Sequence, residues 1–307
     1  MKITTRFLYK YLASFAIVLA AIMALVACTS KSSGRPVITV SIQPQKYLLE
    51  HIVGKHFEVI CLLSQGSNPE TYEPSMNHLM NLEKSKAYFL IGNIGFEMAI
   101  VDKAKKNNPD IKIYDNSANI DIIYGSHSGI AHSHEEHAGH KHESDPHIWT
   151  SAVNARIIAT NMCNAVCELD PAHAPYYKKR LGELCKQIDT LDAQLREQLK
   201  PIEGDAFIVW HPSLSYFARD YGLKQITMEY EGKEIPAKYL KTEIDSAKAC
   251  NARIFFFQKE FDSRQAESIN QELGTKMVTI NPMNYNWDTE LKHIADALTS
   301  EENNRAE

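Results

Sequence analysis

Short apolar runs rich in β-branched and aromatic residues alternate with longer segments of helical periodicity along most of this chain. In the first half, strand-like runs lie at 37–42, 59–63, 88–91 and 111–114, and helical patterns lie at 45–53, 75–85 and 96–107. In the second half, strand-like runs lie at 207–210, 225–228, 253–257 and 277–280, and helical patterns lie at 213–221, 236–251, 263–273 and 288–299. This alternation predicts an α/β fold with parallel strands joined by helical crossovers.

A nearly continuous helical stretch separates the two halves. The pattern at 151–169 is followed by Asp170-Pro171, and proline is well tolerated in the first turn of a helix. The helix that begins there extends to about residue 200, which at 1.5 Å per residue gives a rod of about 45 Å. We therefore predict two Rossmann-like lobes with parallel sheets, joined by a long rigid helix. The expected division is a signal peptide with its cysteine at 1–28, a tether at 29–36, lobes at 37–150 and 204–300, a helical linker at 151–203 and a polar tail at 301–307.

The first 28 residues have the pattern of a secretory signal. Basic residues precede an apolar run at 11–27, and Leu25-Val26-Ala27-Cys28 resembles the lipobox of bacterial lipoproteins. That resemblance implies cleavage before Cys28 and attachment of lipid to it, which would hold the chain at the periplasmic face of a membrane. The alternative is an uncleaved transmembrane anchor, although the run is short for a span of about 20 apolar residues.

The composition narrows the function classes. Hydrophobic residues make up 44% of the chain and charged residues 23%, as in a globular protein. A net charge of -5 gives no reason to expect nucleic acid binding. Five cysteines remain besides Cys28, and an odd number outside the cytoplasm leaves at least one unpaired. We expect most of the five to be small core residues.

Histidines gather in the middle of the chain. A polar, glycine-containing segment at 126–143 carries His127, His132, His134, His137, His140 and His142. Neutral imidazole is a common ligand of zinc and copper, and such a segment cannot build a core. We expect a mobile loop that attracts metal ions. The alternative is a loop that serves only as a solvated connection.

Four further donor residues lie in loops beside prolines: Glu70, His147, His211 and Asn281. Three of these loops follow predicted strands, and ligands of open parallel sheets bind beyond the carboxyl ends of the strands. Taken singly, His211 is an ordinary hydrogen-bonding residue, Glu70 a solvated carboxylate and Asn281 a turn residue. Their joint occurrence beside a histidine-rich segment favours a metal site.

The order of these motifs resembles the zinc- and manganese-binding lipoproteins of bacterial ABC importers. The segments that carry the resemblance are D-P-H-x-W at 145–149 and H-P-S-x-x-Y-F at 211–217. The lipobox and the histidine-rich insertion precede the first of these motifs, and the long helix lies between the two. The insertion resembles the zinc branch of the family. The resemblance covers essentially the whole mature chain. It implies two α/β lobes with one metal ion in the cleft, bound by His147, His211 and residues from both lobes.

Two positions depart from the family pattern. Glu70 stands where the family has its first histidine, and Asn281 stands where it usually has its last acidic ligand. Glu70, His147 and His211 form a set of two histidines and one carboxylate, with Asn281 or water as a fourth ligand. This set suits zinc, and also manganese or iron(II), so the departures affect the identity of the metal more than its binding.

These features favour a monomeric binding protein that captures zinc and passes it to an ABC importer permease, with a lipid anchor in the membrane. In this hypothesis the loop histidines collect metal weakly before the cleft takes it. One alternative is a surface metal buffer or adhesin without a permease. Another is a zinc hydrolase, because three protein ligands plus water is also a catalytic arrangement. The sequence contains no HExxH motif, and the tether and two-lobe layout favour capture over catalysis.

Overall fold

The computed structural model describes residues 34–64, 66–67, 69, 72–124, 144–230, 233–234, 237–259, 261 and 263–300. Cys28, Glu70 and the six histidines of the segment at 126–143 lie outside the described residues. Pro36–Glu307 form one compact unit, separate from Met1–Arg35, and this unit contains two parallel sheets. None of the helices among the described residues has the length and apolar character required to span a bilayer.

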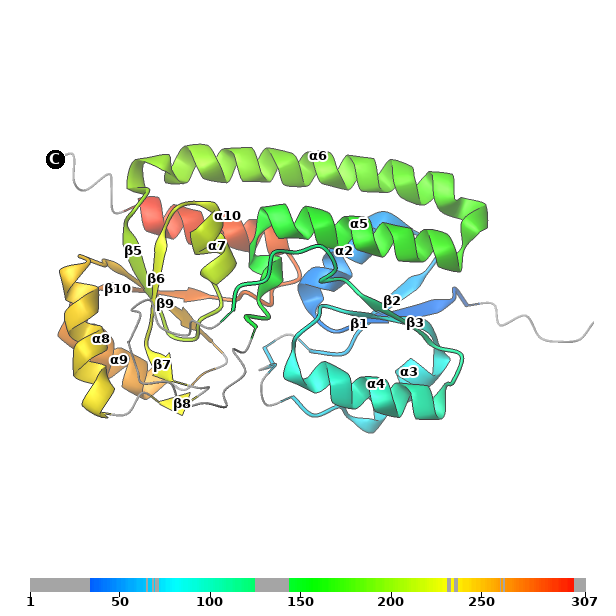
Figure 1. Ribbon diagram of the computed structural model, residues 1–307, viewed down its shortest axis with the longest axis horizontal. Helices are drawn as coiled ribbons and strands as arrows, with labels where there is room; N and C mark the ends of the chain where they lie inside the picture. Colours follow the sequence, from blue (N-terminus) through cyan, green and yellow to red (C-terminus); the bar gives the residue numbers. More distant parts are fainter. Residues whose placement is uncertain are drawn as a thin grey trace, which may run out of the picture. The chain divides into compact units, whose positions relative to one another are not determined.

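The first lobe is a parallel sheet with strand order β2-β1-β3-β4 (Figure 1). Its strands are β1 (Val37–Val40), β2 (Glu58–Cys61), β3 (Ser85–Leu90) and β4 (Lys112–Asp115). Its helices are α2 (Gln43–Val53), α3 (Met76–Lys84) and α4 (Gly95–Asn107), with α2 on one face of the sheet and α3 and α4 on the other. Alternating strands and helices therefore produce the predicted crossovers.

The second lobe repeats this layout with strand order β10-β9-β5-β6. Its strands are β5 (Ala206–Val209), β6 (Lys224–Thr227), β9 (Ile254–Gln258) and β10 (Lys276–Ile280). Its helices are α7 (Ser215–Asp220), α8 (Ala237–Ala249), α9 (Ser263–Leu273) and α10 (Trp287–Thr299). A short antiparallel hairpin of β7 (Glu229–Tyr230) and β8 (Lys233–Glu234) was not predicted. Two residues per strand are too few to produce a periodic signal.

The helical connection consists of η1 (Ile148–Thr150), α5 (Ala152–Leu169), η2 (Pro171–His173), α6 (Ala174–Leu199) and η3 (Lys200–Ile202). The Ser151 hydroxyl caps α5 by accepting the backbone N–H of Asn154 at 2.9 Å. Helix α6 buries one stripe of residues at helical spacing, including Leu184, Ile188 and Leu191. It packs on α2 and α5 of the first half and on α10 of the second, so the predicted long helix joining two lobes is confirmed (Figure 1).

One hydrophobic core extends through both lobes. It includes Ile38 and Phe89 of the first sheet, Leu191 of α6, Phe256 of the second sheet and Trp287 of α10. A second core under α8 and α9 contains the neighbours of Phe256 on β9, so that strand is buried on both faces, as is usual in parallel sheets. A shared core makes large relative motion of the lobes costly, because moving one lobe would expose apolar surface.

The five described cysteines are unpaired. Cys163 is buried, but Cys250 is exposed and the other three are half-buried. The expectation that most are core residues is therefore only partly correct. Cys61 and Cys167 are only partly buried where they pack against the main core, and Cys250 follows the last residue of α8.

Candidate metal centre

Two histidines from distant parts of the chain meet where the lobes join. His211 follows the carboxyl end of β5, and His147 lies just before η1, at the start of the helical connection. Each is only 6% exposed. Their Nε2 atoms are 3.2 Å apart. The structure therefore brings together the two histidines that the sequence singled out.

This separation is compatible with binding of one zinc ion by both rings. Zinc–imidazole bonds of about 2.0–2.1 Å at a tetrahedral angle place the two nitrogen atoms about 3.3–3.4 Å apart. The observed 3.2 Å is close to that value. The two rings are inclined at 73°, so they are not stacked on one another, and the short distance between their Nε2 atoms shows that these atoms face each other.

A carboxylate orients each ring from behind. Asp145 Oδ1 is 2.8 Å from His147 Nδ1, and Glu229 Oε2 is 2.9 Å from His211 Nδ1. A carboxylate only accepts, so each Nδ1 carries the proton and each Nε2 presents a lone pair. Two lone pairs that face each other at 3.2 Å repel unless a proton or a metal ion lies between them. Carboxylate–histidine–metal arrangements of this type fix the tautomer of a ligand and raise its basicity.

The Asp145 carboxyl is held in its charged form. Burial raises its pKa, but the neighbouring His147 ring and hydrogen bonds from the His147 side chain and backbone outweigh that effect. The net result is a pKa below the usual value. The carboxylate is therefore available at neutral pH to accept the Nδ1–H of His147.

Aromatic groups hold both histidines in place. The Phe261 ring stacks on His211 with centroids 5.2 Å apart, and Trp149 lies 5.2 Å from His147. The Trp149 indole N–H donates to the Pro282 carbonyl at 2.8 Å, which connects the His147 segment to the second lobe. The Tyr216 hydroxyl of α7 donates to the Asp145 carbonyl at 2.8 Å. These contacts pre-organise the pair and reduce the entropy cost of binding.

The two rings line a small cavity, with room for about one particle the size of a water molecule. Its lining consists of Pro69, His147, Trp149, His211, Ser213, Gln258, Phe261, Pro282 and Met283. Pro69 comes from the first lobe and immediately precedes Glu70, so the loop that carries Glu70 reaches this cavity. Glu70 itself lies outside the described residues.

Asn281 lies beside the cavity and is not among its lining residues. Its side-chain oxygen accepts the backbone N–H of Met283 at 3.1 Å, and its own backbone N–H donates to Glu290 at 2.7 Å. Both bonds shape the turn that follows β10. The amide oxygen of Asn281 thus has a structural partner, while the next two residues, Pro282 and Met283, reach the site.

Sequence reasoning missed Glu229 and Gln258. Gln258 is the last residue of β9; its amide accepts the His211 backbone N–H at 3.2 Å and donates to the His211 carbonyl at 2.7 Å. Both side chains are buried, and both follow or end a strand of the second sheet. The signal available in the sequence was a polar residue at the carboxyl end of an apolar strand, which is the rule that found His211.

Comparison with known proteins identifies the family. Residues 38–300 match the family described as "Zinc-uptake complex component A periplasmic". The chain is 25% identical over 260 residues to the high-affinity zinc uptake system protein ZnuA of Bacillus subtilis, covering 83% of this chain and 80% of that protein. It is 22% identical over 280 residues to the zinc-binding protein AdcA of Streptococcus pyogenes, covering 87% of this chain but only 54% of AdcA, so it spans about half the length of that relative.

Solved structures agree with this assignment. A crystal structure of ZnuA superposes with a TM-score of 0.79 and 35% identity, covering 87% of this chain and 99% of the other. A ZnuA deletion mutant with zinc bound superposes with a TM-score of 0.78 and 34% identity, covering 87% and 97%. The matched segment contains both lobes and the long helix. This chain belongs to the family of periplasmic zinc-uptake component A proteins.

Proposed function

We propose that this protein captures a divalent transition metal, zinc above all, between its lobes and delivers it to an ABC importer. The observation that supports this most strongly is the pair of buried histidines with facing Nε2 atoms 3.2 Å apart, each oriented by a carboxylate. The names of the relatives, which describe zinc binding and zinc uptake, point to the same cargo.

The proposed ligands are His147 and His211 through Nε2 and Glu70 through its carboxylate, with Asn281 or water in the fourth position. The support for Glu70 is the place of Pro69 in the wall of the cavity. Asn281 would have to share its side-chain oxygen with the Met283 N–H or give up that bond, which favours water as the fourth ligand. Two imidazoles, one carboxylate and a water suit tetrahedral zinc.

Metal identity follows from the same ligand set. Nitrogen-rich sites favour zinc, whereas carboxylate and water ligands suit manganese, and two histidines with one carboxylate can also bind iron(II). The small cavity and the fixed rings favour a four-coordinate ion, since a six-coordinate ion needs room for additional waters. We therefore propose zinc as the cargo, with manganese and iron(II) as weaker competitors.

Anchoring and delivery complete the proposal. Lipid on Cys28 would hold the protein at the periplasmic membrane surface, where the histidines of the segment at 126–143 would raise the local concentration of zinc. A monomer would then present the loaded cleft to the permease. The continuous core through both lobes supports a mechanism in which the permease recognises a small change in shape, because a wide hinge motion would disrupt that core.

A cellular experiment tests capture and delivery together. A strain that lacks the gene is grown in zinc-depleted medium and complemented with the wild type, with His147→Ala/His211→Ala, or with Cys28→Ala. We expect zinc accumulation with the wild type, none above background with the double variant, and loss of the protein from the membrane fraction with Cys28→Ala. Tight zinc binding in vitro without any effect on accumulation would refute delivery and leave a metal buffer.

A further inference from the structure

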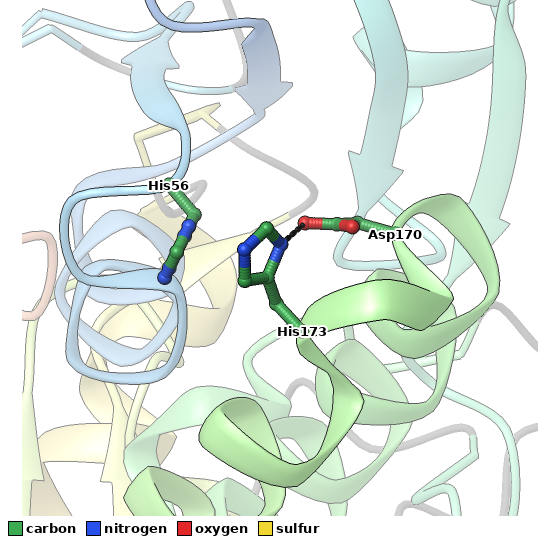
Figure 2. Close-up of side chains that lie close together, drawn as sticks. All are labelled: His56, Asp170 and His173. Atoms are coloured by element: carbon green, nitrogen blue, oxygen red, sulfur yellow. Dashed lines mark hydrogen bonds and ion pairs between the residues drawn. The ribbon is translucent and has the colours of Figure 1, made fainter.

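Three side chains with metal-binding atoms gather where the first lobe meets the helical connection, away from the histidine pair. They are His56, Asp170 and His173, and one potential ligand atom from each lies within 4.8 Å of the others (Figure 2). His56 lies in the turn that follows α2, whereas Asp170 directly follows α5 and His173 is the last residue of η2. The rings of His56 and His173 face each other in Figure 2, with centroids 4.0 Å apart.

This cluster is separate from the inter-lobe site. Ser151, four residues after His147, caps the first turn of α5, whereas Asp170 follows the last turn. An α-helix of 18 residues is about 27 Å long. The two groups therefore share no residue and lie at opposite ends of one helix.

The chemistry of the three groups suits a borderline cation such as zinc. Asp170 Oδ2 is 2.7 Å from His173 Nδ1 and accepts the Tyr177 hydroxyl at 2.6 Å. Burial raises the pKa of Asp170, but these hydrogen bonds and the adjacent histidines lower it more, so the group is a carboxylate at neutral pH. Burial, and then the neighbouring His173 and Lys55, lower the pKa of His56 against the effect of Asp170, which favours the neutral imidazole that binds metals.

Contacts with α6 fix the turn that carries His56. Gly54 has a φ of 54°, and a Cβ there would collide with the hydroxyl of Tyr176. The Arg180 guanidinium donates from Nε to the His51 carbonyl at 2.6 Å. These contacts hold the end of α2 against α6, so His56 is positioned opposite His173 before any ion arrives.

Helix capping alone does not account for the arrangement. Asp170 and His173 are three residues apart, and their bond is an ordinary feature of a helix turn. His56 comes from another segment, so the bond between Asp170 and His173 does not explain its place. A contact between two aromatic rings would also not require a carboxylate beside them. We propose that His56, Asp170 and His173 form a second site for a divalent transition ion such as zinc, with water completing a tetrahedral shell.

This site binds more weakly than the inter-lobe pair. The His173 side chain is 48% exposed, so an ion there stays in contact with solvent, and the His173 ring must lose rotamer freedom to bind it. The site would load only at zinc concentrations that already fill the inter-lobe site. Its occupancy therefore reports high local zinc and is not part of tight capture.

A histidine-resolved footprinting experiment tests this assignment without interference from other histidines. The full protein is treated with diethyl pyrocarbonate at neutral pH across a series of zinc sulfate concentrations, and acylation of each histidine is measured by mass spectrometry. We expect zinc to slow the acylation of His56 and His173 together. The exposed His293 on α10 serves as the internal reference and should not change.

Variants separate coordination from general effects of zinc. In His56→Ala and in Asp170→Asn, the zinc concentration that half-protects His173 should rise by at least about tenfold, since the first variant removes a ligand and the second replaces a carboxylate by a weaker neutral donor. The matched control is His51→Ala, which removes a histidine from the last turn of α2 and should leave protection of His173 unchanged. Asp170→Asn retains an oxygen that can accept from His173 and Tyr177, so it tests the charge without dismantling the turn.

Either of two results would overturn the proposal. His173 could react at the same rate with and without millimolar zinc, or its protection could persist unchanged in both His56→Ala and Asp170→Asn. In either case the cluster is a helix cap with two rings in contact only. Because the inter-lobe histidines are followed in the same spectra, failure here is distinguishable from failure of the proposed capture function.

Discussion

Replacing Glu229 by glutamine tests whether the inter-lobe histidines are built as metal ligands. Glu229 lies at the start of the short hairpin, is buried, and places Oε2 2.9 Å from His211 Nδ1. Glutamine retains the size of the side chain and an oxygen that can accept the same N–H. What it removes is the negative charge that makes His211 more basic and partly neutralises a bound cation.

The expected loss of zinc affinity follows from the role of the Glu229 carboxylate. Loss of a carboxylate that orients a metal-bound histidine costs about 10- to 100-fold in metal affinity. Each tenfold is about 1.4 kcal/mol. Because glutamine can keep the hydrogen bond, we expect the lower end, about tenfold weaker zinc binding. The thermal stability of the metal-free protein should be little changed, since removing a buried charge offsets the loss of one charge-assisted bond.

The assay is competition for zinc against a chromophoric chelator of known affinity, with the melting temperature of the metal-free protein measured in parallel. Glu267→Gln provides the matched control, because Glu267 is an exposed carboxylate on α9 of the same lobe. A Glu229→Gln affinity within twofold of the wild type would refute the reasoning. It would mean that the His211–Glu229 bond serves folding and not metal binding.

Further predictions concern the loop, the fourth ligand and pH. Deleting residues 126–143 should leave the tight zinc affinity nearly intact and reduce the number of weakly bound ions in equilibrium dialysis. Asn281→Asp should strengthen zinc binding in calorimetry if residue 281 reaches the ion, and unchanged affinity would assign that position to water. Zinc affinity should fall below about pH 6.5, because protons compete for the histidines. Burial raises the pKa of the Glu97 carboxyl to about 7, so its contribution to stability is lost as pH rises through 7. The stability of the wild type relative to Glu97→Gln should therefore increase between pH 8 and pH 5 in denaturant titrations, and a difference independent of pH would contradict this.

The fold could be predicted because its signal is local. Each predicted strand overlaps an observed one, since residues such as Phe255–Phe257 are buried on both faces and form uninterrupted apolar runs. The buried stripe of α6 likewise repeats at helical spacing over 26 residues. The β7–β8 hairpin was not predicted because its two-residue strands are too short to show an alternating pattern.

The site could be predicted only in part. His147 and His211 stood out through their motifs, but they meet through long-range contacts such as the hydrogen bond from the Trp149 indole to the Pro282 carbonyl, which joins residues 133 positions apart. Glu229 lies beside His211 because of the register in which β5 and β6 pair, and the sequence alone does not reveal that register. The same holds for the cluster at the end of α5, because His56 meets His173 only through the packing of α2 on α6.

The most direct test of the central claim is zinc content and competitive affinity of the soluble chain that begins after Cys28, measured beside His147→Ala/His211→Ala. We predict one tightly bound zinc ion in the wild type and its loss in the double variant, with weak binding retained. Equal tight binding in both proteins would contradict the account, because the primary site would then lie elsewhere. Absence of any tight zinc in the wild type would contradict capture itself.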